Sequence, residues 1–170
     1  MSILYVVATP LGNLEDLTFR AARILREVPT VVAEAPRHTK KLLVHLGATP
    51  RLIGYREDSS ESREDAILER LRAGDVALVV DGGTPGISDP GPDLVARVRS
   101  EGMPVVPVPG PSALTTALSM VSFARQPMAF LGFLPERRSR RERMIRKTSV
   151  VARTLVIYLP PHGAAGRLAE

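Results

Sequence analysis

The chain has 170 residues, of which 44 % are hydrophobic, and a net charge of +5. This length allows one medium-sized domain, or one domain and part of another. The absence of cysteine excludes disulfides and cysteine-based metal or redox chemistry, and it fits a reducing compartment. No apolar run approaches the roughly 20 residues that span a bilayer, and the first eight residues resemble a buried strand more than a signal peptide. We therefore expect a cytoplasmic protein that does not bind membranes.

Short apolar runs alternate with helical patterns in the first two thirds of the chain. The runs predict strands at residues 3–8, 31–33, 51–55, 76–80 and 105–106. Apolar residues at helical spacing predict helices at residues 17–27, 38–46, 63–73, 92–101 and 112–120. Asp16 or Thr18 can cap the first helix, and Ser60 or Ser62 the third. Such alternation is typical of an α/β fold with a mostly parallel sheet flanked by helices on both faces.

The composition changes near residue 124. A polar connector at 122–126 leads to a predicted strand at 128–134, an arginine-rich helix and a strand at 154–159. We predict an N-terminal α/β domain over residues 1–123 and the beginning of a C-terminal α/β domain over residues 124–170. Two strands cannot bury a core of their own. The second part should therefore pack on the first, be completed by a partner, or continue in a longer chain.

Two loops rich in small residues follow neighbouring predicted strands. The first spans residues 81–91 and the second 107–113. Glycine lets main-chain N–H groups approach a ligand closely, and ligands of parallel sheets bind at the carboxyl ends of the strands. Loops 9–13 and 34–38 should end at the same edge. These loops predict a ligand site, although ordinary tight connections between strands and helices would have similar sequences.

Positive charge is concentrated between residues 137 and 147. Seven basic residues lie there beside a single acid, Glu142, which gives this segment +6 and leaves the rest of the chain at −1. The basic residues are Arg137, Arg138, Arg140, Arg141, Arg143, Arg146 and Lys147. Such a cluster is typical of a surface that binds a phosphate backbone. The alternative is a solvated helix face with no partner.

Four stretches, at residues 4–18, 81–91, 107–118 and 131–135, occur in an order that resembles the bacterial small-subunit ribosomal RNA 2′-O-methyltransferases. These belong to the tetrapyrrole (corrin/porphyrin) methylase superfamily, and the resemblance covers essentially the whole chain. It implies a two-domain methylase that binds S-adenosylmethionine in a cleft between domains and forms a homodimer. The implied substrate is the ribose 2′-hydroxyl of a cytidine in small-subunit ribosomal RNA, free or in the 30S subunit. Members of the family are longer than this chain.

The resemblance also implies which residues contact the cofactor. They are Leu11, Gly83, Thr84, Pro85, Gly86, Ile87, Ser112, Ala113, Phe133, Tyr158 and Leu159. Asp81 ends a strand beside the glycine loop, so it could contact the cofactor directly or only orient the loop. We include it among the cofactor-binding candidates.

The chain departs from the family pattern at three places. Ala35 and Pro36 stand where the family has aspartate and threonine. A second set of changes removes an acid and an arginine, at Leu159, Pro160 and Gly163. Gly82 replaces a usual alanine. The first two sets flank the expected active site and therefore put catalysis in question more than the fold.

Methyl transfer to a hydroxyl needs a positioned oxygen and an acceptor for its proton. Our catalytic candidates are Glu34, His38 and Arg37, the last as a donor to an RNA phosphate. Asp89 could also take a proton, but we expect it to cap the following helix instead. Glu34 could equally make a structural hydrogen bond, and His38 could simply occupy a first helical turn. No spacing of His, Asp and Glu predicts a metal site.

Two other functions fit parts of the sequence. The substituted motif residues suggest a degenerate relative that binds RNA without catalysis. The superfamily also contains methyltransferases of small tetrapyrroles of the precorrin and uroporphyrinogen type, although the arginine cluster favours RNA.

Overall fold

The computed structural model describes residues 2–160 and residue 166. Contacts divide the chain into two compact units, Met1–Ala113 and Leu114–Glu170, each of which is described by itself. The sequence-based boundary lay at residues 123 and 124, whereas the contacts divide at the start of helix α5 (Ala113–Ser119). None of the residues of α5 is buried, so packing does not assign this helix clearly to either unit.

The first unit is built on a five-stranded sheet with the strand order β3-β2-β4-β1-β5. Its strands are β1 (Leu4–Val7), β2 (Thr30–Ala33), β3 (Arg51–Gly54), β4 (Val76–Val79) and β5 (Val105–Val108). All four pairings between these strands are parallel, which confirms the predicted sheet. Because the strands are parallel, the segments that follow them emerge at one edge.

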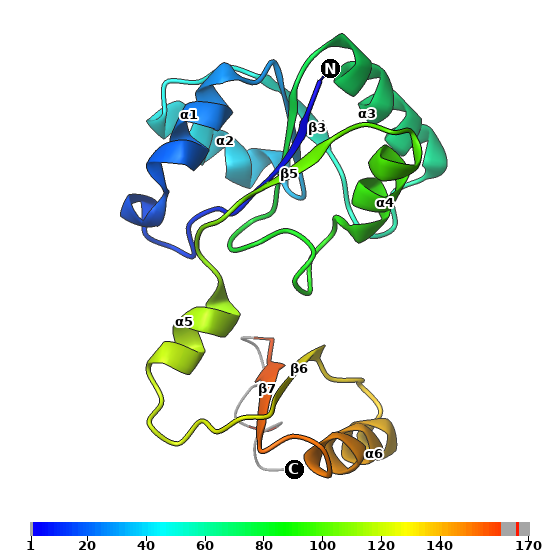
Figure 1. Cartoon of the computed structure of the whole chain (residues 1–170). Coiled ribbons are helices and arrows are strands. Elements are labelled where there is room, and N and C mark those ends of the chain that lie inside the picture. The colour runs from blue at the N-terminus through cyan, green and yellow to red at the C-terminus, as the bar shows by residue number, and fades with distance from the viewer. Residues whose placement is uncertain (1, 161–165, 167–170) are drawn as a thin grey trace. The chain divides into compact units, whose positions relative to one another are not determined.

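Helices cover both faces of this sheet (Figure 1). They are α1 (Phe19–Glu27), α2 (Pro36–His45), α3 (Glu61–Ala73) and α4 (Pro92–Ser100). Ile24 and Leu25 of α1 pack with Leu42 and Leu43 of α2 in one buried cluster. Residues of α3 and α4, Ile67 among them, form a second cluster on the opposite face. Two buried layers on one sheet explain why its strands have apolar side chains on both faces.

Local capping decides where the helices begin. Of the two predicted caps for α1, Thr18 is used: its hydroxyl accepts a hydrogen bond of 3.1 Å from the N–H of Ala21. Asp16 instead lies in a short 3-10 helix, Leu14–Asp16, which the sequence analysis did not predict. Helix α2 begins at Pro36, two residues earlier than predicted, since proline suits the first helical position.

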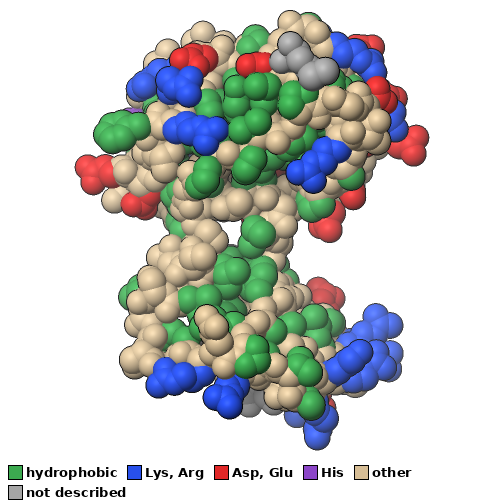
Figure 2. Space-filling model, in the orientation of Figure 1, with side chains coloured by type: hydrophobic (Ala, Val, Ile, Leu, Met, Phe, Trp, Pro, Cys, Tyr) green, Lys and Arg blue, Asp and Glu red, His purple; other side chains and the backbone are tan. Residues whose placement is uncertain are grey.

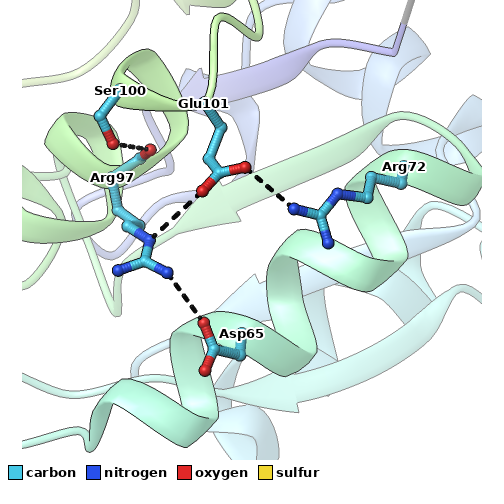
Figure 3. A network of polar contacts seen from close by, with 5 residues as sticks. All are labelled: Asp65, Arg72, Arg97, Ser100 and Glu101. Atoms are coloured by element: carbon cyan, nitrogen blue, oxygen red, sulfur yellow. Dashed lines mark hydrogen bonds and ion pairs between the residues drawn. The ribbon is translucent and has the colours of Figure 1, made fainter.

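A polar network joins the outer surfaces of α3 and α4 (Figure 3). Arg97 lies 3.1 Å from Asp65 and 3.9 Å from Glu101, and Glu101 lies 2.9 Å from Arg72. The hydroxyl of Ser100 donates to the main-chain oxygen of Arg97. The charged side chains are 34–60 % exposed, which weakens their ion pairs, so the apolar cluster beneath them contributes most to holding the two helices to the sheet.

The second unit contains two parallel strands, β6 (Met128–Phe133) and β7 (Thr154–Tyr158), joined through α6 (Arg138–Ser149). Among its described residues, Ala152 is the one hydrophobic side chain that counts as buried. Large apolar side chains such as Phe123 and Val150 are more than 70 % exposed. Such a small sheet buries almost no core of its own. No helix within the described residues is long and apolar enough to span a membrane.

Candidate functional site

The loops after β1 and β4 are locked together at the carboxyl edge of the sheet. Thr9 and Gly83 exchange two main-chain hydrogen bonds of 2.9 Å in an isolated antiparallel bridge. The hydroxyl of Thr9 also donates to the main-chain oxygen of Val80 at 3.0 Å. These bonds satisfy buried polar groups and fix the glycine loop relative to the end of β1.

Glycine is needed where these loops meet. A Cβ at Gly82 would lie 3.0 Å from the carbonyl oxygen of Pro10, so the loops approach more closely than the usual alanine would allow without movement. Gly83 has a φ of +94°, which disfavours any other residue. The Leu11 side chain lies against Gly83 and is 41 % exposed. The predicted glycine loop is therefore closely packed at Gly83, and the exposed apolar side chain of Leu11 lies directly against it.

The loop after β5 joins the same assembly. The Thr84 hydroxyl donates to the main-chain oxygen of Pro111 at 3.0 Å, directly before Ser112. The structure thus brings three predicted cofactor segments together, around Leu11, Gly83–Thr84 and Ser112–Ala113. Pro85 and Gly86 line a separate cavity of about 210 Å³. Ile87 is half-buried and closes a turn to the Thr84 oxygen.

A cavity of about 260 Å³ lies beside these loops, against the N-terminal half of α2. Two predicted site residues, His38 and Asp81, line it together although they come from different elements. The remaining lining residues are Thr9, Pro10, Gly12, Leu14, Thr39, Lys41, Leu42 and Val80. The side chain of Arg37, in the same helical turn as His38, is exposed to solvent.

Three carboxylates interact near the ends of β2 and β4. Burial is the main factor that raises the pKa of Asp89 to about 6, and the charges of Glu34 and Asp81 raise it further. Glu34, directly after β2, lines another cavity of about 400 Å³. Because its pKa lies near neutrality, Asp89 is suited to exchange protons with a bound molecule.

The predicted capping role of Asp89 is wrong. The N-cap residue of α4 is Gly91, and no side chain makes a capping hydrogen bond at the start of this helix. Proline at the first helical position removes one of the N–H groups that a cap would satisfy. The carboxylate of Asp89 is therefore not used to begin the helix.

The substitutions at residues 35 and 36 fall at a helix start. Ala35 is the N-cap residue of α2, with an extended backbone and no side-chain cap bond, and Pro36 follows at the first helical position. Aspartate at an N-cap accepts a hydrogen bond from a free N–H group of the first turn. An aspartate at position 35 would therefore be placed to cap α2, which gives the lost acid a structural role beside the catalytic one.

In the second unit, two predicted cofactor residues contact each other. The ring centroids of Phe133 and Tyr158 lie 5.6 Å apart, and Phe130 lies 4.8 Å from Tyr158. Phe133 is 55 % exposed, while Leu159 and Pro160 are half-buried. The substitution at Gly163 lies outside the described residues.

The basic residues of the second unit are carried mainly by α6, over which Lys and Arg side chains gather in Figure 2. Arg138 pairs with Glu142 at 2.8 Å, and Arg141 donates to the main-chain oxygen of Glu136. For the other five predicted RNA-binding residues, the described part of the chain offers no ion pair. These are Arg137, Arg140, Arg143, Arg146 and Lys147.

Metal ligands are not grouped in the part of the chain that the structure describes: no three His, Asp or Glu side chains there are placed to hold one ion. The charges of Glu34 and Asp81 act on Asp89, but the three carboxylates do not form such a group.

Sequence reasoning did not single out Thr39. It lines the 260 Å³ cavity, is 3 % exposed, and its hydroxyl oxygen has no hydrogen-bond partner among the described residues. The signal available in the sequence was its spacing, since Thr39, Leu42, Leu43 and Leu46 repeat on one helical stripe. A polar residue on a buried apolar stripe needs an explanation.

Comparison with known proteins agrees with this geometry. The family model described as Tetrapyrrole (Corrin/Porphyrin) Methylases matches residues 3–170. The chain belongs to the tetrapyrrole methylase family. This confirms the fold class expected from the sequence.

Several relatives carry the name ribosomal RNA small subunit methyltransferase I. The chain is 42 % identical to that of Halalkalibacterium halodurans over 94 % of its own length and 55 % of the relative's. It is 45 % identical to that of Coprothermobacter proteolyticus, over 94 % of this chain and 73 % of that protein. The chain thus spans between about half and three quarters of these relatives.

Solved structures of the tetrapyrrole methylase fold also match. The uroporphyrin III C-methyl transferase of Thermus thermophilus aligns with a TM-score of 0.65 at 24 % identity, covering 99 % of this chain and 73 % of that one. Diphthine synthase aligns with a TM-score of 0.75 at 18 % identity, over 94 % and 66 % of the two chains. At these identities the likeness concerns the fold alone.

Proposed function

We propose that this protein is an S-adenosylmethionine-dependent methyltransferase that acts on the ribose 2′-hydroxyl of a cytidine in small-subunit ribosomal RNA. The observation that carries the proposal is the 41–45 % identity to several relatives named as methyltransferases of that RNA. Such a substrate is met in the cytoplasm as part of the small subunit. We include a homodimer in the proposal, on the resemblance to the family.

The loops of the first unit suit the cofactor. The exposed Leu11 side chain offers an apolar contact beside the glycine loop, in which Gly82 and Thr84 are partly exposed. The residues that we assign to the cofactor are Leu11, Gly83, Thr84, Pro85, Gly86, Ile87, Ser112 and Ala113 in the first unit and Phe133, Tyr158 and Leu159 in the second. When bound, S-adenosylmethionine supplies an activated methyl group on a sulfonium.

The protein must then hold the ribose oxygen and accept its proton. We assign the proton to a carboxylate oxygen of Asp89, since a pKa of about 6 leaves this group mainly ionised at neutral pH. Glu34 raises that pKa by its charge and so tunes the acceptor. His38 is the alternative acceptor, and Arg37, exposed in the same turn, is assigned to an RNA phosphate.

Helix α6 is assigned to the RNA backbone. Arg137, just before the helix, and four basic residues within it have no ion pair among the described residues. The charge of these five residues is therefore available to phosphates. Direct base recognition is not expected from this helix.

The two alternative functions have weaker support. A tetrapyrrole substrate is suggested by the description of the family and by a solved structure at 24 % identity, which indicates the fold alone. A non-catalytic relative was suggested by Ala35 and Pro36 together with Leu159 and Pro160, and the first two residues now have a structural explanation as a helix start.

The test is methyl transfer from labelled S-adenosylmethionine to small ribosomal subunits taken from cells that lack the gene. We expect label in the ribosomal RNA, recovered after nuclease digestion as 2′-O-methylcytidine. Subunits from cells that carry the gene are the control, because their site is already methylated. Label in neither sample, with cofactor binding intact, would favour the non-catalytic relative.

A further inference from the structure

The cavity beside α2 combines an apolar lining with few polar groups. Its apolar walls come from three segments, at Pro10, Leu14, Leu42 and Val80. With about 260 Å³, it lies just below the roughly 300–1,000 Å³ of sites for drug-sized molecules. A group of one or two rings fits this space better than a whole tetrapyrrole does.

Two threonines with buried side chains line this cavity, and their hydroxyls differ in hydrogen bonding. The hydroxyl of Thr9 donates to the main-chain oxygen of Val80. The hydroxyl of Thr39 is equally buried but has no partner among the described residues. The nearest customary acceptor, the main-chain oxygen of Ala35, already receives the N–H groups of His38 and Thr39.

An unpaired buried hydroxyl destabilises the folded protein, so its presence calls for a reason. Active-site groups that wait for a ligand provide one. Thr39 lies on the same stripe of α2 as Leu42 and Leu43, where valine would pack as well and leave no polar atom. Because the Thr39 side chain lines the cavity, a rotation about its Cα–Cβ bond would bring the buried hydroxyl to a polar group that enters there.

We propose that this cavity receives the base of the nucleotide that is methylated, and that the Thr39 hydroxyl bonds an edge of that base. This inference rests on the proposed function and adds where the substrate nucleotide binds. Enzymes that do chemistry on a base take it out of its stack into a snug pocket and bond its Watson–Crick edge. In our proposal the same kind of pocket holds the base while the neighbouring ribose reacts.

The other polar lining groups fit a cytosine. The Asp81 carboxylate accepts hydrogen bonds only, and the exocyclic amine of cytosine donates them. Lys41 and His38 line the same cavity and are exposed, which suits contact with a phosphate or ribose. This assigns Asp81 to the base, rather than to the cofactor as the sequence analysis expected.

The test uses the natural full-length protein and three threonine variants. Thr39→Val removes the hydroxyl and keeps the shape, while Thr39→Ser keeps the hydroxyl. Thr30→Val is the matched control, because Thr30 is buried at the amino end of β2, away from the cavity. For each protein, KM for small subunits lacking the methyl group and Kd for S-adenosylmethionine are measured separately.

We expect Thr39→Val to raise KM for the subunits about tenfold, the loss of one buried hydrogen bond. Thr39→Ser should remain within about threefold of the natural protein, and Thr30→Val should not change KM. Kd for the cofactor should stay constant in all three. An unchanged KM in Thr39→Val, or a weakened Kd for the cofactor, would overturn the inference while leaving the proposed function standing. If the natural protein itself transfers no methyl group, the proposed function fails first.

Discussion

At the scale of single residues, Asp89 offers the clearest link between environment and chemistry. Burial and the charges of Glu34 and Asp81 raise its pKa to about 6, so the folded state binds this proton more tightly than the unfolded state does. Its favourable contribution to stability is fully present below about pH 4 and is lost as the pH rises through about 6.

Replacing Asp89 by asparagine should therefore stabilise the protein at pH 8 and have little effect at pH 4. We expect a gain of about 1 kcal/mol at pH 8, reduced from the full pKa shift because the group is partly solvated. Urea unfolding at the two pH values measures it, with Asp58→Asn, an exposed site, as control. An equal change in the free energy of unfolding at both pH values would contradict the raised pKa of Asp89.

The residue Ala35 gives a second prediction. Ala35→Asp should add the side-chain cap that α2 lacks and raise the free energy of unfolding by about 1 kcal/mol. Ala96→Asp, on an exposed position inside α4, should not stabilise. Thermal unfolding of both variants decides it. If Ala35→Asp left stability unchanged but restored or raised methyl transfer, the acid at this position would have a catalytic role instead.

Sequence-based prediction succeeded for the positions of the loops that carry the candidate site residues. The loops that carry Leu11, Gly83 and Ser112 could be predicted to lie together because parallel strands end at one edge of the sheet, whereas the assignment of these residues to the cofactor came from the family resemblance and stays a prediction. The predicted capping role of Asp89 was wrong, because α4 begins at Pro92 with Gly91 as its N-cap residue and uses no side-chain cap. Thr39 was missed, because a buried hydroxyl without a hydrogen-bond partner can be recognised only once its neighbours in the structure are known.

At the scale of elements, we expect apolar packing to stabilise the position of α3 and α4 more than the surface ion pairs between them do. Glu101→Gln removes the two ion pairs of Glu101 and should lower the free energy of unfolding by less than about 1 kcal/mol. This effect should be smaller still at high salt, which screens the charges. Ile67→Ala, in the fully buried layer beneath, should cost about 2–5 kcal/mol. Denaturant titration compares them; similar costs would mean that the ion pairs carry more stability than their exposure suggests.

Helix α6 gives the prediction for RNA binding. Replacing Arg140 and Arg143 together by glutamine should weaken binding to small-subunit RNA and lower the slope of log affinity against log salt by about 1–2. The matched control is the pair Arg70→Gln and Arg99→Gln, exposed on the first unit. Binding measured between about 50 and 200 mM salt tests it. An equal loss in both double variants would indicate a general effect of net charge.

The order and type of the helices and strands followed from the sequence because their patterns are strong. Buried strands such as β4 are continuous apolar runs, and α3 repeats Ile67, Leu68 and Leu71 on one side. The boundary between the units was less predictable. The polar connector marked residue 124, but contacts divide at Ala113, because α5 buries nothing that would tie it to the first unit.

At the scale of the whole molecule, the two units differ in what they can do alone. The first has two buried layers and holds the locked loops and the cavity beside α2. The second exposes large apolar side chains and carries the basic helix. The central claim is that a chain with this division of labour methylates a ribose of small-subunit RNA.

The most direct test is to compare the modified nucleosides of small-subunit ribosomal RNA from cells with the gene, without it, and with it restored. Our account predicts that one 2′-O-methylcytidine disappears on deletion and returns with the gene, while the remaining modifications stay constant. An identical set of modified nucleosides in all three strains would contradict the account.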